Sequence, residues 1–241
     1  MHWDPFSTLR NALWIGGGQW AGKTTVGGIL AERYGVTHYH YDYHDARGHN
    51  DRRLALRIHR GEPAAEPNWE SVWIGQTPQQ MADEVLAGFA DRFAWVLDDL
   101  RALVTPLPIV ADGWGLRPEL VASITDDLRR MVVLVPTDDW RLSQSTRLPR
   151  ARAISHKVSD PALAQRNRLE RDRLIAEDAV RAARDLGIRV IEVDGSGTPE
   201  TLADQVAGHF SPFLPASNPY LVEPAERSRM SRARCTAEER P

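Results

Sequence analysis

The chain has 241 residues, 42% of them hydrophobic and 26% charged, with a formal net charge of −3. This composition is typical of an ordinary globular protein, and the weak negative charge disfavours non-specific binding to nucleic acid or to an anionic membrane. The single cysteine, Cys235, excludes an intramolecular disulfide, and no apolar run is long enough to span a bilayer. We therefore expect a cytoplasmic monomer or homodimer that binds neither nucleic acid nor membrane.

Five short runs rich in valine and isoleucine predict the strands of a parallel sheet that is buried on both faces. Helical stretches separate these runs, and the alternation is typical of a three-layer α/β/α fold. We assign the folded domain to residues 1–211. The predicted strands are 12–15, 36–41, 108–111, 131–135 and 189–193.

Apolar residues at steps of three and four predict the helices between these strands. The first runs from about residue 22 to residue 34, and Gly35 would end it. Residues 83–104 predict one long amphipathic helix, with Pro78 near its start. Two further helices are expected at 166–186 and 201–210.

Three segments stand outside this framework. Residues 45–76 are long and polar, and we interpret them as an acceptor-binding insertion. Residues 137–165 are rich in arginine and form the predicted lid. Residues 212–241 are rich in proline and then arginine, so we interpret them as a flexible tail. The alternative for the tail is that its first part packs back on the domain.

A complete phosphate-binding loop, G-x-x-x-x-G-K-T, lies between the first predicted strand and the first predicted helix. Its glycines let the backbone wrap closely, so that N–H groups and the helix N-terminus bind phosphate oxygens. Lys23 would bridge the β- and γ-phosphates of ATP, and the Thr24 hydroxyl would bind Mg²⁺. The alternative is a glycine-rich turn with an exposed lysine. The predicted nucleotide-binding residues here are Gly17, Gly18, Gln19, Trp20, Ala21, Gly22, Lys23, Thr24 and Thr25.

The third predicted strand ends in an aspartate, Asp112. In P-loop folds an acid at this place holds Mg²⁺ directly or through water. Thr24 and Asp112 are therefore the predicted metal-binding residues. The alternative is a turn or capping aspartate in front of Gly113.

The order of these parts, over roughly residues 10–210, resembles the nucleoside-monophosphate-kinase-like group of P-loop small-molecule kinases. Shikimate kinase, gluconate kinase, chloramphenicol phosphotransferase and adenylate kinase are members of this group. The resemblance implies an acid that faces the acceptor after the second strand, which Asp42 matches. It also implies phosphate-binding arginines from the lid and the helix after it, and an adenine-contacting loop after the fifth strand. The matching residues are Arg147, Arg150, Arg152, Arg166, Arg168, Arg171, Gly195, Ser196 and Gly197.

These features predict ATP- and Mg²⁺-dependent phosphoryl transfer to a hydroxyl or phosphate group of a small-molecule acceptor. Lys23, Arg147 and Arg168 would stabilise the charge on the transferred group, and Asp42 would orient the acceptor or accept its proton. A nucleoside or nucleotide kinase is one possibility within this class. The alternative from another class is a regulatory module that hydrolyses ATP slowly and acts on a protein partner.

Histidines and aspartate alternate along the second predicted strand, at His38, His40, Asp42 and His44. On a continuous strand these side chains would share one face. A zinc site is one interpretation, but neighbours about 6–7 Å apart are too widely spaced for all four to reach one ion. We expect them instead to line the acceptor pocket.

The insertion, together with Trp114 after the third predicted strand, carries two sets of candidate acceptor-binding side chains. The basic set could bind an anionic acceptor. The tryptophans could stack on a planar ring or, equally, attach the insertion to the core. The two sets are Arg47, His49, Arg52, Arg53 and Arg57, and Trp69, Trp73 and Trp114.

Overall fold

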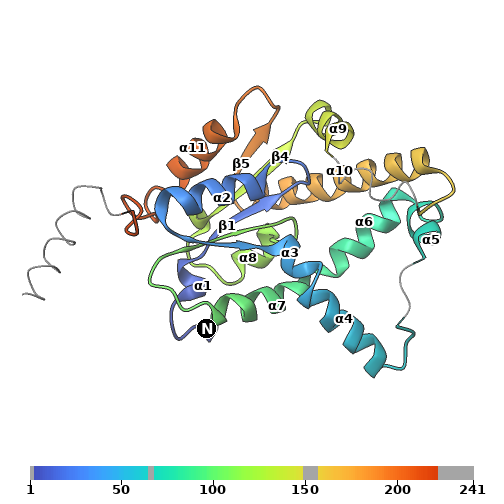
Figure 1. The fold of residues 1–241 in the computed structure, drawn as a ribbon, viewed down its shortest axis with the longest axis horizontal. Helices are drawn as coiled ribbons and strands as arrows, with labels where there is room; N and C mark the ends of the chain where they lie inside the picture. Colours follow the sequence, from blue (N-terminus) through green and yellow to red (C-terminus); the bar gives the residue numbers. More distant parts are fainter. Residues whose placement is uncertain (1–2, 65–67, 149–156, 222–241) are drawn as a thin grey trace, which may run out of the picture.

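A five-stranded sheet forms the centre of the computed structural model, which describes residues 3–64, 68–148 and 157–221 (Figure 1). All neighbouring strands are parallel, and their order is β2-β3-β1-β4-β5. The five predicted strands are confirmed, with small shifts at their ends. They are β1 (Leu13–Gly17), β2 (Thr37–His40), β3 (Ile109–Asp112), β4 (Met131–Pro136) and β5 (Arg189–Val193).

Helices connect the strands and cover both faces of the sheet (Figure 1). In chain order they are α1 (Thr8–Asn11), α2 (Lys23–Tyr34), α3 (Tyr41–Asp45), α4 (Gly48–His59), α5 (Trp69–Trp73), α6 (Pro78–Ala87), α7 (Phe89–Ala102), α8 (Pro118–Ala122), the 3-10 helix η1 (Leu128–Arg130), α9 (Asp138–Arg147), α10 (Pro161–Asp185) and α11 (Pro199–Phe210). Within the described ranges, none of these helices is both long and apolar enough to cross a membrane.

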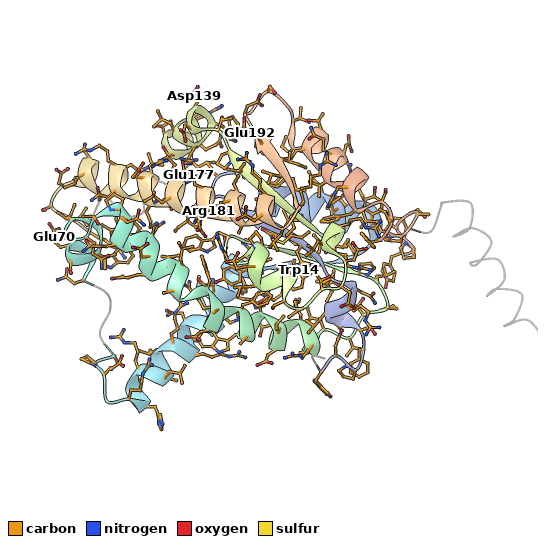
Figure 2. The ribbon with its side chains drawn as sticks, turned by 180° about the vertical axis from the view of Figure 1, so that it is seen from behind. Trp14, Glu70, Asp139, Glu177, Arg181 and Glu192 are labelled. Atoms are coloured by element: carbon orange, nitrogen blue, oxygen red, sulfur yellow. The ribbon has the colours of Figure 1, made fainter. Side chains whose placement is uncertain are left out.

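Alternate residues of the strands enter two separate apolar cores. On one face of the sheet, Leu13 and Ile15 of β1 pack with side chains of α2 and α11. On the other face, Trp14 packs with side chains of α7, α8 and α10 (Figure 2). Such burial on both sides explains why the strands are continuous apolar runs. The predicted three-layer α/β/α fold is confirmed.

The helix after the phosphate-binding loop has the predicted ends. Gly22, with φ of 78°, precedes its first residue, and Gly35, with φ of 67°, follows its last. Both values lie in the left-handed region, where glycine is favoured because it lacks a Cβ atom. Helix α10 begins earlier than predicted, because the side chain of Asp160 caps it by accepting from Leu163 N–H.

The single helix predicted over residues 83–104 is wrong. The chain forms α6 and α7, which meet at Gly88. At this junction Arg92 donates from Nε to Gly88 O and from Nη2 to Val85 O, so that carbonyl groups are satisfied at the break. Phe89 and Phe93 are buried beyond it. The apolar periodicity therefore continues across the junction and does not reveal it.

The insertion and the predicted lid contain regular structure. Helices α4 and α5 lie within residues 45–76, and α9 occupies the first part of residues 137–165. Residues 161–165 already belong to α10. Residues 149–156 lie outside the described part of the chain, and with them the lid candidates Arg150 and Arg152.

The segment directly after α11 packs against the domain. Phe213 and Leu214 contact the core on the α2 and α11 side of the sheet, and Asn218 donates from Nδ2 to Glu32 O at 2.8 Å. The interpretation as a flexible tail is therefore wrong for residues 212–221. Residues 222–241, with Cys235, lie outside the described part of the chain.

Candidate active site

The predicted phosphate-binding loop follows β1, the central strand, at the carboxyl end of the sheet. It passes very close to β4. Gly17 has φ of 112°, and a Cβ atom there would lie 2.1 Å from Leu134 O. Gly18 donates its N–H to the same oxygen at 2.9 Å. Only glycine fits at Gly17, for backbone conformation and for space.

Lys23 is the first residue of α2, and its side chain folds back over the loop. Its Nζ donates to Gly18 O at 2.6 Å and to Gly17 O at 3.3 Å. Although charged, the residue is buried. The ammonium group therefore lies among the backbone atoms that would surround a phosphate. Of the other predicted loop residues, Trp20 and Ala21 are buried, Gln19 is half-buried, and Gly22, Thr24 and Thr25 are exposed.

The structure brings the two predicted metal-binding residues together. Thr24 donates from Oγ1 to Asp112 Oδ2 at 2.9 Å. Asp112 is fully buried at the end of β3, and the parallel register places it beside Ile15 of β1. A hydroxyl and a carboxylate oxygen are suitable ligands for Mg²⁺, which usually binds one or two carboxylates and keeps several waters.

Two histidines of β2 contact Asp112, and this role was not predicted. Nε2 of His38 lies 2.7 Å and Nδ1 of His40 lies 3.1 Å from Asp112 Oδ1. His38 can approach because α2 has Gly27 at the contact, where a Cβ atom would lie 2.4 Å from the imidazole. Burial alone would raise the pKa of Asp112, but hydrogen bonds from the two histidines outweigh it and lower the pKa. The alternating histidines were the available signal.

Asp42 lies in α3 and not on the second strand, which ends at His40. Its Oδ1 is buried and has no hydrogen-bond partner. Burial raises the pKa of this carboxyl above its ordinary value, although Lys23 and His40 act in the opposite direction. Asp42 follows β2 by two residues and therefore lies at the same end of the parallel sheet as the phosphate-binding loop.

The four alternating side chains do not share one face, because the strand ends before Asp42. His44 stacks on Tyr39 with ring centroids 4.3 Å apart, and its Nδ1 lies 3.6 Å from Asp99 Oδ2. Across the described ranges, no group of three histidine, cysteine, aspartate or glutamate side chains could hold a metal ion.

The predicted phosphate-binding arginines differ in position. The guanidinium of Arg168 lies over the Trp20 ring, 5.2 Å from its centroid, and thus beside the loop. Arg171 pairs with Asp172, its neighbour on α10. Arg147 is exposed at the end of α9, and Arg166 is exposed on α10.

The charged side chains of the insertion have partners within the protein. Arg53 donates to Asp45 at 2.8 Å, and Arg57 to Pro63 O at 2.6 Å. Nε2 of His49 lies 2.8 Å from Asp99 Oδ2. Arg47 lies over the Tyr43 ring, and Nη2 of Arg52 is 3.8 Å from Asp99. Protein groups therefore already neutralise or cover much of this basic set.

The tryptophans of the insertion form a small apolar cluster. Trp73 is buried with Met81 of α6 and Ala164 of α10, and Trp69 packs against the same cluster. Trp114 meets Phe89 edge to face at 5.3 Å. The contacts of Trp69 and Trp73 support the interpretation that these two tryptophans attach the insertion to the domain, whereas Trp114 lies outside the insertion and packs against α7.

The loop between β5 and α11 carries the predicted adenine-contacting residues. Asp194 Oδ1 accepts from Ser196 N and Oγ at 2.9 and 2.7 Å. Gly195 has φ of 81°, and a Cβ atom there would lie 2.1 Å from the Trp140 ring of α9. Gly197 follows, just before α11. The loop is therefore shaped by a tight turn and by close contact with the first turn of α9.

No protein-family model matches the sequence, and no curated protein matches it either. Among solved structures, the chain is similar to shikimate kinases, which are P-loop small-molecule kinases. Shikimate kinase from Acinetobacter baumannii, in complex with shikimate, is 19% identical with a TM-score of 0.47, over 86% of this chain and 98% of that chain. Shikimate kinase from Aquifex aeolicus is 17% identical with a TM-score of 0.38, over 83% and 95%. This similarity concerns the fold alone and does not indicate the substrate of this protein.

Proposed function

We propose that this protein transfers a phosphoryl group from ATP, with Mg²⁺, to a hydroxyl or phosphate group of a small-molecule acceptor. One observation carries the proposal. Lys23, the Thr24–Asp112 pair and Asp42 all lie at the carboxyl ends of neighbouring parallel strands, and Oδ1 of Asp42 is buried without a hydrogen-bond partner. A phosphate-binding loop alone would fit many nucleotide-binding proteins, but a buried acid beside it fits an acceptor site.

The loop fits the phosphates of a nucleotide. It has backbone at positive φ at Gly17 and Gly22, the N-terminus of α2, and a buried ammonium group. The Thr24 hydroxyl and the Asp112 carboxylate would hold the metal ion, and the lowered pKa keeps Asp112 ionised at neutral pH. When bound, the nucleotide supplies the phosphoryl group, and the metal ion neutralises part of its charge.

The protein side chains have two tasks in such a transfer. Lys23 stabilises negative charge on the phosphates, and Arg168 and Arg147 would add charge from α10 and α9. Asp42 orients the acceptor hydroxyl and accepts its proton. A carboxyl whose pKa is raised is a better base than an ordinary aspartate, because proton transfer to it is more favourable.

The test is a transfer assay with γ-labelled ATP against a panel of nucleosides, nucleotides, sugars and hydroxylated antibiotics. We expect label on at least one acceptor class and a stimulation of ADP release by that acceptor. Asp42→Asn should strongly lower both effects, and Asp51→Asn, an exposed acid of α4, serves as the control. Label that appears only as inorganic phosphate, at a rate that no acceptor changes, would instead indicate the regulatory ATPase.

A further inference from the structure

Trp20 has an unusual backbone conformation in the phosphate-binding loop. Its φ is 71°. Glycines aside, Ser7 is the only other described residue with a positive φ. A bulky side chain in this left-handed region is strained, because its Cβ atom crowds the backbone. Strain of this kind persists only where surrounding contacts hold the residue in place.

A buried acid of α10 supplies one such contact. The indole Nε1 of Trp20 donates to Asp172 Oδ2 at 3.2 Å, and both residues are buried. Arg168, one turn earlier on the same helix, lies over the indole ring at 5.2 Å. The loop is therefore attached to α10 by a hydrogen bond to a carboxylate and by a cation–π contact.

The other oxygen of Asp172 connects this contact to the acceptor insertion. Oδ1 accepts from Arg171 Nη2 at 2.5 Å and from Nε at 3.0 Å. The Arg171 guanidinium lies 4.8 Å from the Trp73 ring of α5 and 5.6 Å from the Trp114 ring. This pairing fixes the orientation of the buried carboxyl group, so that its Oδ2 can accept from the indole N–H.

We propose that Trp20 and Asp172 form a latch that holds the phosphate-binding loop in its nucleotide-binding conformation, with Asp172 as a positioning residue. The proposal rests on nucleotide binding at this loop, as proposed above. Without the latch, the strained residue relaxes and the loop has to be reordered when the nucleotide binds. That reordering weakens binding, because the loop is no longer preorganised.

The test is a double-mutant cycle read by calorimetric titration of Mg²⁺–ATP. Trp20→Phe removes the indole donor and keeps an aromatic ring, and Asp172→Ala removes the acceptor. Loss of a hydrogen bond to a charged group predicts about tenfold weaker binding for each single variant. The double variant should bind no more weakly than the weaker single variant. Independent, multiplying effects on the dissociation constant would contradict the latch.

Two controls match these substitutions. Trp95→Phe changes a tryptophan of α7, and Asp178→Ala changes an acid of α10 that pairs with Arg117 and Arg181 (Figure 2 labels Arg181). Urea unfolding checks that every variant is folded. Amide hydrogen exchange of residues 17–24 should be faster in the latch variants and unchanged in the controls. Exchange that rises only in proportion to a loss of global stability would show a structural role and no latch.

Trp20→Gly tests whether the Trp20 side chain holds the loop or is only tolerated in this strained conformation. Glycine adopts a φ of 71° without strain, so it would bind ATP as well as the wild type if the side chain were dispensable. The latch predicts weaker binding and faster exchange in this variant. Wild-type protein that binds no Mg²⁺–ATP would refute the proposed function, and loop exchange in the ligand-free variants would still decide whether Trp20 and Asp172 hold the loop.

Discussion

Thr24 donates a hydrogen bond of 2.9 Å to the buried carboxylate of Asp112, which joins the first turn of α2 to the end of β3. The two residues are far apart in the sequence, and the strand order brings them together because β3 lies beside β1. Thr24 is exposed and Asp112 is not, so the pair places a hydroxyl at the surface and a carboxylate beneath it. This arrangement fits a metal ion that bridges the protein and a nucleotide.

Replacing the buried acid should weaken the response to magnesium. In Asp112→Asn the amide keeps hydrogen-bonding capacity towards Thr24 and the histidines but loses the negative charge. We expect an apparent Mg²⁺ affinity about 10–100-fold lower, measured as the Mg²⁺ dependence of ADP release. Asp127→Asn, at a half-buried acid paired with Arg129, is the control. An unchanged Mg²⁺ dependence would remove Asp112 from the metal site.

Replacing Asp42, the acid of α3, should lower acceptor phosphorylation far more than it lowers ATP affinity. Asp42→Asn should lower acceptor phosphorylation by about 10²–10⁴-fold if Asp42 is the base, with little change in ATP affinity. Equal losses in transfer and in ATP affinity would argue against an acceptor role.

The stability of the same variant should depend on pH. Burial raises the folded-state pKa of Asp42 above the ordinary value of 3.8, so the wild-type protein loses stability as pH rises and this carboxyl ionises. Asp42→Asn lacks this loss. The free energy of unfolding of Asp42→Asn, measured in urea, should therefore increase relative to that of the wild type between pH 4 and pH 7. If the free energy of unfolding of Asp42→Asn instead falls relative to that of the wild type as pH rises, the folded protein stabilises the carboxylate and the prediction is contradicted.

Two glycines with positive φ on either side of β5 can be compared. Gly195 and Gly187 have φ of 81° and 68°, but only at Gly195 would a Cβ atom meet another side chain, the Trp140 ring. Both alanine variants should lose roughly 1–3 kcal/mol from backbone strain. Gly195→Ala should lose more, because Trp140 has to move. Equal losses in urea unfolding would show that the contact with Trp140 is unimportant.

Attachment of the insertion can be tested at Trp73. Because the ring is buried with Met81 and Ala164, Trp73→Ala should lower the free energy of unfolding by about 3–5 kcal/mol. Trp3→Ala, at a ring that is 71% exposed, should change it little. If Trp73→Ala were as stable as the wild type, the ring would not be needed for attachment and would be available to contact a ligand.

The sequence predicted the framework because its signals are local. The loop at residues 17–24, the glycine that ends α2 and the acid that ends β3 are each recognisable within a few residues. The strand order was not predictable in this way, because it depends on how segments far apart in the chain pack. The break at Gly88 was missed because buried apolar residues keep a helical spacing across it.

The details of the site depended on contacts between distant residues. His38 and His40 were noticed for their alternation, but their contact with Asp112 arises from the pairing of β2 with β3 and from the space at Gly27. The contact of Trp20 with Asp172 links residues from two elements, and no spacing in the sequence indicates it. Asp42 follows the second strand but lies in α3 and not on the strand, and its role towards the acceptor stays a prediction.

The most direct test of the central claim is the binding of Mg²⁺–ATP to wild-type protein and to Lys23→Ala, measured by calorimetry. Arg33→Ala, at a half-buried charge of the same helix that pairs with Asp204, is the control. The site predicts saturable binding by the wild type and the control, and a loss of about 10–100-fold in Lys23→Ala, because a buried ammonium group no longer meets the phosphates. Equal affinity of Lys23→Ala and wild type, with both proteins folded, would contradict the assignment of this loop as the nucleotide site.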